Sequence, residues 1–273
     1  MFGVGGKELF TLRNVVQPDT LPEAYKILRE KKSNTILGGC AWLRMGSQII
    51  HTGVDLTKLG LNYINNCTGH IEIGAMATLR ELETHQALQE YCGGVVPQAV
   101  GNIIGVQFRN VATAGASVFS RYGFSDLLTI LLVLDTEIEL YDGGRMGLAE
   151  FMDRPRTKDI LTKIIIHKTE RQAAYQALRN SASDYPVLTA AVSRLGAEWQ
   201  IAVGARPTKA RLALEAVKLL SGGDIPVVVM EQAAQAAATE LPFGDNMRGS
   251  AEYRQAMCRV LVKRAIAEVA ACK

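Results

Sequence analysis

The spacing of apolar and polar residues divides the chain into three stretches, 1–57, 58–168 and 169–273. In the first, apolar positions recur at helical spacing over 22–32, where Pro22 occupies a first turn that tolerates proline. A short apolar strand at 35–37 follows, and another is expected around 54–56. The pattern predicts a small α/β subdomain over 1–57.

The middle stretch mixes strands, helices and one long loop. Ile71 and Ile73 alternate with Glu72, which indicates a strand. Thr78 and Glu81 have the spacing of a capping box, which predicts the start of a helix. We expect the remaining elements in this order: the body of that helix over 79–91, a loop rich in small residues at 101–118, a buried helix over 127–134, and strands at 136–141 and 164–166. This stretch forms the second predicted α/β subdomain.

The third stretch is rich in alanine and mostly helical. Two probable strands, 187–195 and 197–205, are separated by a turn at Gly196. Ser250 is placed to cap the last helix. Helices are predicted over 208–220, 229–241 and 250–269. The whole chain is therefore expected to belong to the α+β class, with an antiparallel sheet and helices at its C-terminal end.

Composition narrows the possible functions. Hydrophobic residues make up 48% and charged residues 21% of the 273 residues, as in ordinary folded proteins. The net charge of +3 comes without a dense basic block, which argues against nucleic-acid binding. No apolar run approaches the roughly 20 residues of a membrane span, and no signal peptide is evident. We expect a cytoplasmic protein without membrane insertion.

The cysteines and histidines give no sign of a metal site. Five cysteines are present, at spacings that match no zinc or iron–sulfur motif. The four histidines are scattered, and no nucleophile–base or paired-carboxylate array accompanies them. We therefore predict no metal ligands and no catalytic side chain.

Two loops could hold an anionic ligand. In the first, a strand enters Gly38-Gly39 and then Cys40, and successive free N–H groups in such a turn can bind phosphate oxygens. The same pattern is purely structural in most proteins. In the second, small residues at 112–117 permit close approach of a ligand to the backbone. Asp126 further on either accepts hydrogen bonds from sugar hydroxyls or caps a helix beside Ser125.

These loops carry a family resemblance. The chain resembles the FAD-binding medium subunit of the molybdenum hydroxylases, which include xanthine dehydrogenase and carbon monoxide dehydrogenase. The segment 37–43 stands where that family has Ala-Gly-Gly-Thr-Asp-Leu. Arg109-Asn110, Thr113, Gly115 and Ser125-Asp126 follow the family's second motif in order. Blocks at 73–78, 159–161 and 250–265 also match, so the resemblance covers nearly the whole chain.

The resemblance implies a fold and a function. Two small α/β subdomains of the PCMH or vanillyl-alcohol-oxidase type would clasp FAD between them, with a C-terminal sheet-and-helix domain beside them. Electrons would arrive from a [2Fe–2S] small subunit and leave to an acceptor such as NAD, while the large partner subunit holds the molybdenum cofactor. The cofactor-binding residues implied are Leu37, Gly38, Gly39, Cys40, Ala41, Trp42, Gly74, Thr78, Arg109, Thr113, Ala114, Gly115, Ala116, Ser117, Ser125, Asp126 and Tyr185.

Several of these positions have a second interpretation. Arg109 could brace a loop as easily as contact phosphate, and Trp42 could simply pack behind the first loop. Tyr185 could lie near the flavin ring or in a core at a domain boundary. Ala116 and Ser117 replace the family's Gly-Asn, and Ala116 would be strained if that position needed a positive φ.

Two alternative functions follow from these departures. One is a non-catalytic assembly module of the same fold that binds FAD weakly or not at all. The other is a stand-alone FAD oxidoreductase, which the lack of acid or base candidates near the loops disfavours.

Overall fold

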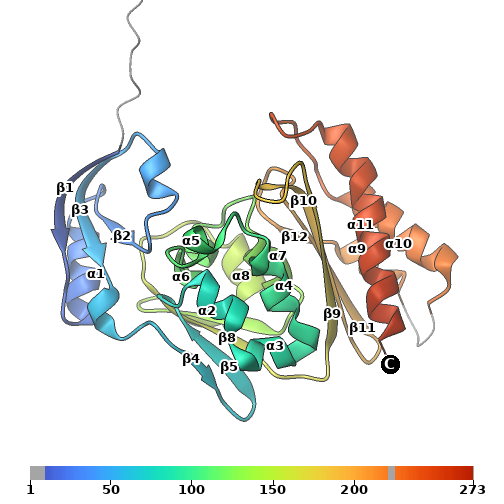
Figure 1. The fold of residues 1–273 in the computed structure, drawn as a ribbon, viewed down its shortest axis with the longest axis horizontal. Coiled ribbons are helices and arrows are strands. Elements are labelled where there is room, and N and C mark those ends of the chain that lie inside the picture. The colour runs from blue at the N-terminus through green and yellow to red at the C-terminus, as the bar shows by residue number, and fades with distance from the viewer. Residues whose placement is uncertain (1–9, 221–224, 273) are drawn as a thin grey trace, which may run out of the picture.

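The computed structural model describes residues 10–220 and 225–272. Three sheets lie side by side, each formed by its own part of the chain (Figure 1). The N-terminal sheet has the order β1-β3-β2, and all of its strands are parallel. Its strands are β1 (Thr11–Val16), β2 (Thr35–Leu37) and β3 (Ile49–Asp55).

One helix, α1 (Leu21–Glu30), packs on the N-terminal sheet. Thr20 caps it by accepting a hydrogen bond from the N–H of Glu23, and Pro22 lies in its first turn. Ala24 and Leu28 are buried in a small core that Ile160 of the middle part completes. The helical spacing of apolar residues in this segment therefore predicted the correct element.

The middle sheet is antiparallel and has the order β4-β5-β8-β6-β7. Strand β5 pairs with the central strand β8, so that Ile71 lies opposite Ile166 and Ile73 opposite Ile164. The five strands are β4 (Ile64–Asn66), β5 (His70–Gly74), β6 (Thr136–Leu140), β7 (Gly144–Gly147) and β8 (Leu161–His167). The strands expected around 71–73, 136–141 and 164–166 are present.

Short helices cover this sheet and differ from the prediction. The helix expected over 79–91 is interrupted at His85, which has an extended backbone. Thr78 and Glu81 form the predicted capping box. The loop expected over 101–118 contains two short helices. The helices of the middle part are α2 (Leu79–Thr84), α3 (Gln86–Glu90), α4 (Val95–Gly101), α5 (Val106–Arg109), α6 (Ala114–Phe119), α7 (Asp126–Leu131) and α8 (Leu148–Asp153).

The C-terminal sheet is antiparallel, in the order β12-β11-β10-β9, and buries both of its faces. In β10, Ala191 faces the core of the middle part, whereas Ala190 and Val192 face the C-terminal helices. This follows from the alternation of side chains along a strand. The strands are β9 (Gln172–Arg179), β10 (Pro186–Leu195), β11 (Glu198–Gly204) and β12 (Arg211–Leu212).

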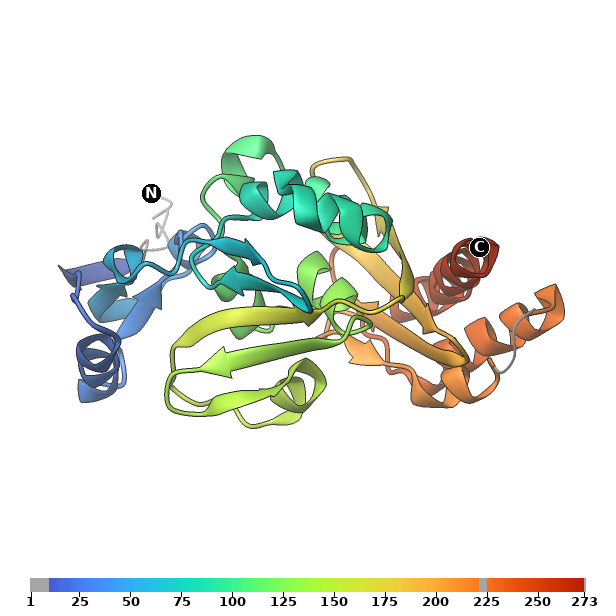
Figure 2. The same cartoon turned by 90° about the horizontal axis from the view of Figure 1, so that it is seen from below.

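Helices α9 (Leu214–Lys218), α10 (Val227–Glu240) and α11 (Ala251–Ala271) cover the outer face of this sheet (Figure 2). Ser250 caps α11, as predicted. The helix expected over 208–220 is reduced to α9, because β12 pairs with β11 ahead of it. The architecture confirms the α+β class. In the part of the chain described, no helix is long and apolar enough to cross a membrane.

Candidate functional site

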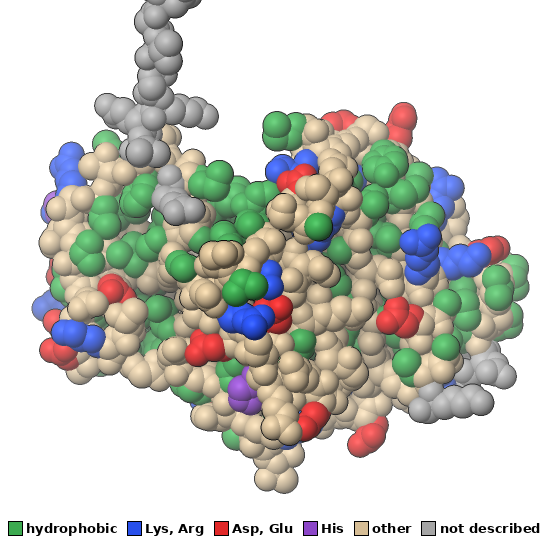
Figure 3. All heavy atoms as spheres, viewed as in Figure 1, with side chains coloured by type: hydrophobic (Ala, Val, Ile, Leu, Met, Phe, Trp, Pro, Cys, Tyr) green, Lys and Arg blue, Asp and Glu red, His purple; other side chains and the backbone are tan. Residues whose placement is uncertain are grey.

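A cavity of about 380 Å³ lies where the three parts of the molecule meet. Its lining includes Gly38 from the N-terminal part, Ser117 from the middle part and Tyr185 from the C-terminal part. The volume is within the range of small-molecule sites, about 300–1,000 Å³. Figure 3 shows hydrophobic side chains gathered in the hollow between the N-terminal sheet and the rest of the molecule.

The first loop leaves β2 and turns through a left-handed backbone. Gly39 has φ +70° and Cys40 has φ +54°. A Cβ at Gly39 would lie 1.8 Å from the carbonyl oxygen of Val111, so no side chain fits there. Within the described residues, the N–H groups of 39–42 donate to no protein acceptor. Consecutive free N–H groups in a tight turn can bind an anion.

The second loop differs because its N–H groups already have partners. Thr113 caps α6 and accepts from the N–H of Ala116, while the N–H of Ser117 donates to the carbonyl of Thr113. The N–H group of Ala114 donates to the carbonyl of Ala77, and that of Gly115 donates to the carbonyl of Ala75. Ala116 lies inside the helix without a positive φ, so the strain considered for it does not arise.

The two loops are in direct contact. A Cβ at Gly38 would lie 3.0 Å from Thr113 Oγ1 and 3.1 Å from Ala116 Cβ. A Cβ at Gly115 would lie 2.6 Å from the carbonyl oxygen of Ala75. Close packing therefore accounts for the small residues in both loops. The cavity lies against the exposed side of the first loop.

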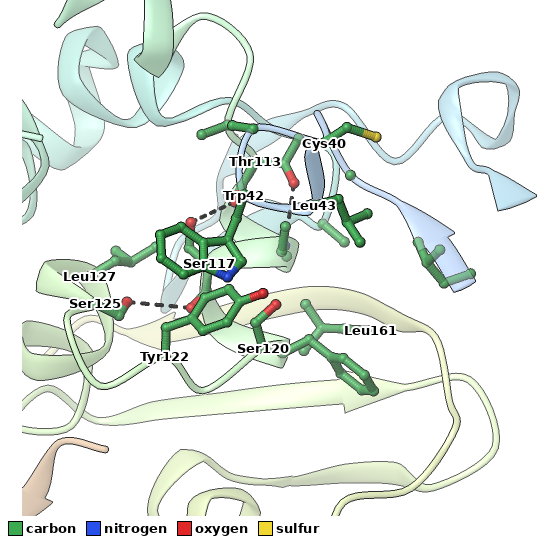
Figure 4. Close-up of a pocket in the computed structure, with 18 of the residues that line it drawn as sticks. Cys40, Trp42, Leu43, Thr113, Ser117, Ser120, Tyr122, Ser125, Leu127 and Leu161 are labelled. Carbon is green, nitrogen blue, oxygen red and sulfur yellow. Dashed lines mark hydrogen bonds between the residues drawn. The ribbon is translucent and has the colours of Figure 1, made fainter. Parts of the chain in front are cut away.

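Four rings form one end of the cavity, and we call them the aromatic cluster: Trp42, Tyr122, Phe124 and Tyr185. The centroid of Trp42 lies 5.2 Å from that of Tyr122 and 4.7 Å from that of Phe124. Tyr185 packs edge-on against Trp42, at 5.7 Å. Figure 4 shows the indole of Trp42 against the ring of Tyr122, with the hydrogen bond from Ser125 to the carbonyl of Ser117 nearby. The cluster offers flat apolar faces to a planar ligand.

Asp126 is buried at the inner wall of the cavity, with 3% of its surface exposed. Its Oδ1 accepts hydrogen bonds from the Tyr175 hydroxyl and the Arg179 guanidinium. Burial raises the pKa of the carboxyl, against the opposing effect of Arg179. Ser125, and not Asp126, caps α7. Among the described residues, no side chain donates a hydrogen bond to Oδ2 of Asp126, and Asp126 lines the cavity.

The structure brings most of the predicted site residues to the cavity. Those that line it are Gly38, Cys40, Ala41, Trp42, Thr113, Gly115, Ala116, Ser117, Ser125, Asp126 and Tyr185. Leu37, Gly39, Gly74, Thr78, Arg109 and Ala114 are not among its lining residues.

The residues away from the lining have other contacts. Thr78 holds the capping box, and a Cβ at Gly74 would lie 2.2 Å from the carbonyl oxygen of Leu61. Arg109 donates to both carboxylate oxygens of Glu83, at 2.8 and 3.0 Å, and to the carbonyl of Ile103. These are the contacts of a residue that braces the loop.

Sequence reasoning missed Tyr122, Phe124 and Arg179 as lining residues. Tyr122 and Phe124 flank Gly123 just ahead of the Ser125-Asp126 pair, and this local clustering of aromatic residues was the available signal. Arg179 gave none, because its partner Asp126 is 53 positions away in the chain.

Comparison with known proteins gives matches to two domain families. Residues 10–169 match the model of the FAD binding domain in molybdopterin dehydrogenase, and residues 173–269 match the CO dehydrogenase flavoprotein C-terminal domain. The uncharacterized protein YgfM of Escherichia coli is 26% identical over 258 residues, which cover 90% of this chain and 92% of that protein.

Two further similarities cover nearly the full length. The nicotine 6-hydroxylase medium subunit of Paenarthrobacter nicotinovorans is 25% identical over 93% of this chain and 96% of its own length. The reconstituted CO dehydrogenase from Oligotropha carboxidovorans contains a chain that superposes with a TM-score of 0.87 at 21% identity. That match covers 96% of this chain and 99% of the other, and it shows that the two share a fold.

Proposed function

This chain belongs to the family of FAD-binding medium subunits of molybdopterin dehydrogenases, and from that premise we propose that it passes electrons through FAD from a [2Fe–2S] partner to an acceptor such as NAD. The observation that carries the proposal is the row of free N–H groups at 39–42, which borders a cavity built from all three parts of the chain. An anionic diphosphate is the natural ligand of such a row.

The residues present fit FAD as follows. The first loop would hold the diphosphate, with the left-handed turn at Gly39 and Cys40 presenting its N–H groups. Oδ2 of Asp126 would accept a hydrogen bond from a ribityl or sugar hydroxyl. The aromatic cluster would pack against the flavin ring and exclude water from it.

In this scheme the protein binds and orients, while the cofactor does the chemistry. Bound FAD supplies a ring system that takes up electrons from one carrier and delivers them to another. In the cavity lining, the buried carboxyl of Asp126 is engaged by Arg179 and Tyr175, so its role would be to orient the cofactor.

Partner subunits complete the proposal. No group of three or more metal-ligating side chains occurs among the described residues, so an iron–sulfur cluster would have to come from another chain. The relative from Paenarthrobacter nicotinovorans is named as a medium subunit, which implies companion chains for that protein. We infer a small [2Fe–2S] subunit and a large molybdenum subunit here too, in a cytoplasmic complex.

A second candidate function rests on a specific observation. All four N–H groups at 114–117 are hydrogen-bonded within the protein, so the second loop has no free donor for a diphosphate. This favours a non-catalytic assembly module with weak FAD binding over a flavoprotein that uses both loops equally.

Fluorescence titration distinguishes the two candidates. The chain has two tryptophans: Trp42 lines the cavity, and Trp199 is buried in the C-terminal core. We expect added FAD to quench tryptophan emission in the full chain, and Trp42→Phe to remove most of that quenching. Trp199→Phe is the matched control and should leave it intact. Absence of FAD binding, alone and with both partners present, would favour the assembly module.

The electron-transfer role has its own test. A tagged copy purified from its native cell should bring down a small iron–sulfur chain and a large molybdenum chain in equal amounts. If the protein instead comes out alone, carries FAD and reduces NAD with a small substrate unaided, it is a stand-alone oxidoreductase.

A further inference from the structure

A second hollow adjoins the flavin cavity at Tyr122, which lines both. Three segments that are far apart in the sequence form it: the loop between α6 and α7, the end of α8 with the residues after it, and the loop between β11 and β12. The lining residues are Arg121, Tyr122, Gly123, Met152, Arg154, Arg156, Pro207 and Lys209. Half of them carry a positive charge.

Backbone contacts hold these segments together. The N–H of Ala205 donates to the carbonyl of Gly123 at 2.7 Å. A Cβ at Gly123 would lie 2.3 Å from the carbonyl oxygen of Pro207, so the two loops pack closely. Lys209 donates to the carbonyl of Met152 and thereby joins the C-terminal part to α8. The hollow is thus built by direct contacts between the middle and C-terminal parts.

The positive charges of the hollow exceed the negative charges near it. Arg121 donates to the carbonyl of Arg154 at 2.6 Å, and Arg156 to that of Ser120 at 2.9 Å. Among the described residues, no carboxylate forms an ion pair with Arg121 or Arg156.

The other two cations do have carboxylate partners, but these lie outside the lining. Arg154 pairs with Glu150, and Lys209 lies 3.2 Å from Asp153. Both carboxylates are more than half exposed to solvent, so their charges are strongly screened. The hollow therefore carries two guanidinium groups that form no ion pair among the described residues.

Arg121 is the most buried of the four cations of the hollow. Only 8% of its surface is exposed, and its guanidinium stacks on the ring of Phe151, 3.9 Å from the centroid. Its Nε is buried and has no hydrogen-bond partner among the described residues. An unpaired buried donor is unfavourable. Burial lowers the pKa of Arg121, the neighbouring cation of Arg156 lowers it further, and the carboxylate of Asp153 acts in the opposite direction.

We propose that this hollow is an anion site that binds the phosphate group of a small molecule, separate from the diphosphate site of the flavin cavity. A guanidinium group can pair with two phosphate oxygens through parallel hydrogen bonds, whereas an ammonium group acts as a point charge. Arg121 and Arg156 are therefore suited to a phosphate group. The bound group neutralises both cations. The phosphate comes either from free phosphate or from a nucleotide that reaches toward the aromatic cluster past Tyr122.

Calorimetric titration of the full chain tests the site. The probes are inorganic phosphate and ADP, each titrated in low salt with and without saturating FAD. We expect phosphate to bind in both conditions, because the hollow lies outside the flavin cavity. Arg156→Gln should weaken binding about tenfold, since it removes one charge-assisted pair. Arg156 is exposed, so this variant should fold normally.

The variants decide between the outcomes. Arg121→Gln should weaken binding by a similar factor, and Arg264→Gln, on the exposed face of α11, is the matched control that should not. Tighter binding of ADP than of phosphate would assign a nucleotide as the source, and equal affinities would assign free phosphate. If neither probe binds, or if Arg264→Gln weakens binding as much as Arg156→Gln, the proposal is overturned. Because the titration without FAD stands on its own, failure of the flavin assignment would not affect this result.

Discussion

Gly39 is the residue on which the first loop depends most. Its left-handed backbone and the carbonyl of Val111, 1.8 Å from where a Cβ would be, leave no room for a side chain. We expect Gly39→Val to displace the row of free N–H groups and to weaken FAD binding at least tenfold, and to lower the free energy of unfolding by about 1–3 kcal/mol. Flavin fluorescence and urea denaturation measure the two effects.

Gly60 offers a control for this variant. It has φ +66°, and a Cβ there would meet nothing within 4 Å. Gly60→Val therefore imposes the backbone strain without the steric clash and should leave FAD affinity unchanged. Equal FAD affinity in the Gly39→Val protein would show that the first loop does not hold the cofactor.

Residues with local roles were predictable from the sequence, and residues with distant partners were not. The capping box of Thr78 and Glu81 spans a single helical turn, so its spacing alone was sufficient. The role of Asp126 depends on Tyr175, 49 positions away, and on Arg179 in the same strand. No local pattern distinguished that buried ion pair from a helix cap.

At the level of elements, an ion pair fastens α5 to α2. Arg109, with 7% of its side chain exposed, is bound by Glu83. The hydrogen bond from Arg109, with a second from Arg80, holds the pKa of Glu83 below its ordinary value. A carboxyl whose pKa is lower in the folded than in the unfolded protein stabilises the fold at pH values above its pKa in the unfolded chain. This stabilisation is lost as the pH falls through its pKa in the folded protein.

We therefore expect the effect of Glu83→Gln to depend on pH. At neutral pH the variant should lose about 1–3 kcal/mol in the free energy of unfolding, because Arg109 stays buried without its counter-charge. In acid, where Glu83 of the wild type is itself protonated, the two proteins should differ little. Glu231→Gln removes an exposed surface pair with Lys263 and should cost little at either pH. A loss independent of pH would contradict the assignment.

Elements were predicted well where apolar periodicity was clear and poorly where pairing with a neighbouring strand decided the structure. The segment of β9 reads QAAYQALR, which lacks the β-branched residues of a typical strand. It is a strand because β10 pairs along almost its whole length and α11 covers it. Similarly, β12 interrupts a segment with helical spacing because the edge of β11 is available to it. Tertiary pairing outweighed local preference in both cases.

Across the whole molecule, Lys158 joins the N-terminal part to the rest. Its ammonium group donates to the carbonyls of Leu28, Lys31 and Asn34, at 3.1, 2.6 and 2.8 Å. We expect Lys158→Met to destabilise the contact between the N-terminal part and the rest by about 2–4 kcal/mol. FAD binding should weaken as well, because the N-terminal and middle parts both line the cavity. Hydrogen exchange of the α1 amides should become faster.

Lys168→Met is the matched control for that experiment. Lys168 donates to one carbonyl, that of Cys67, within the middle part. Its replacement should leave exchange in α1 and the affinity for FAD unchanged. Unaltered exchange in the Lys158→Met protein would mean that the small apolar core around Leu28 is sufficient to hold the N-terminal part in place.

The pairing of β5 with β8 has a consequence for folding of the chain during its synthesis on the ribosome. Lys163 of β8 donates a hydrogen bond to Glu72 of β5 from 91 positions further along the chain, so β5 leaves the exit tunnel long before β8 is made. At about 5–20 residues per second, Ile71 and Ile73 wait roughly 5–20 s without their partner strand. The parallel N-terminal sheet needs only the first 55 residues and can close during that interval. Nascent chains of this protein should thus bind chaperones through the β5 segment, and release them once residue 167 has emerged.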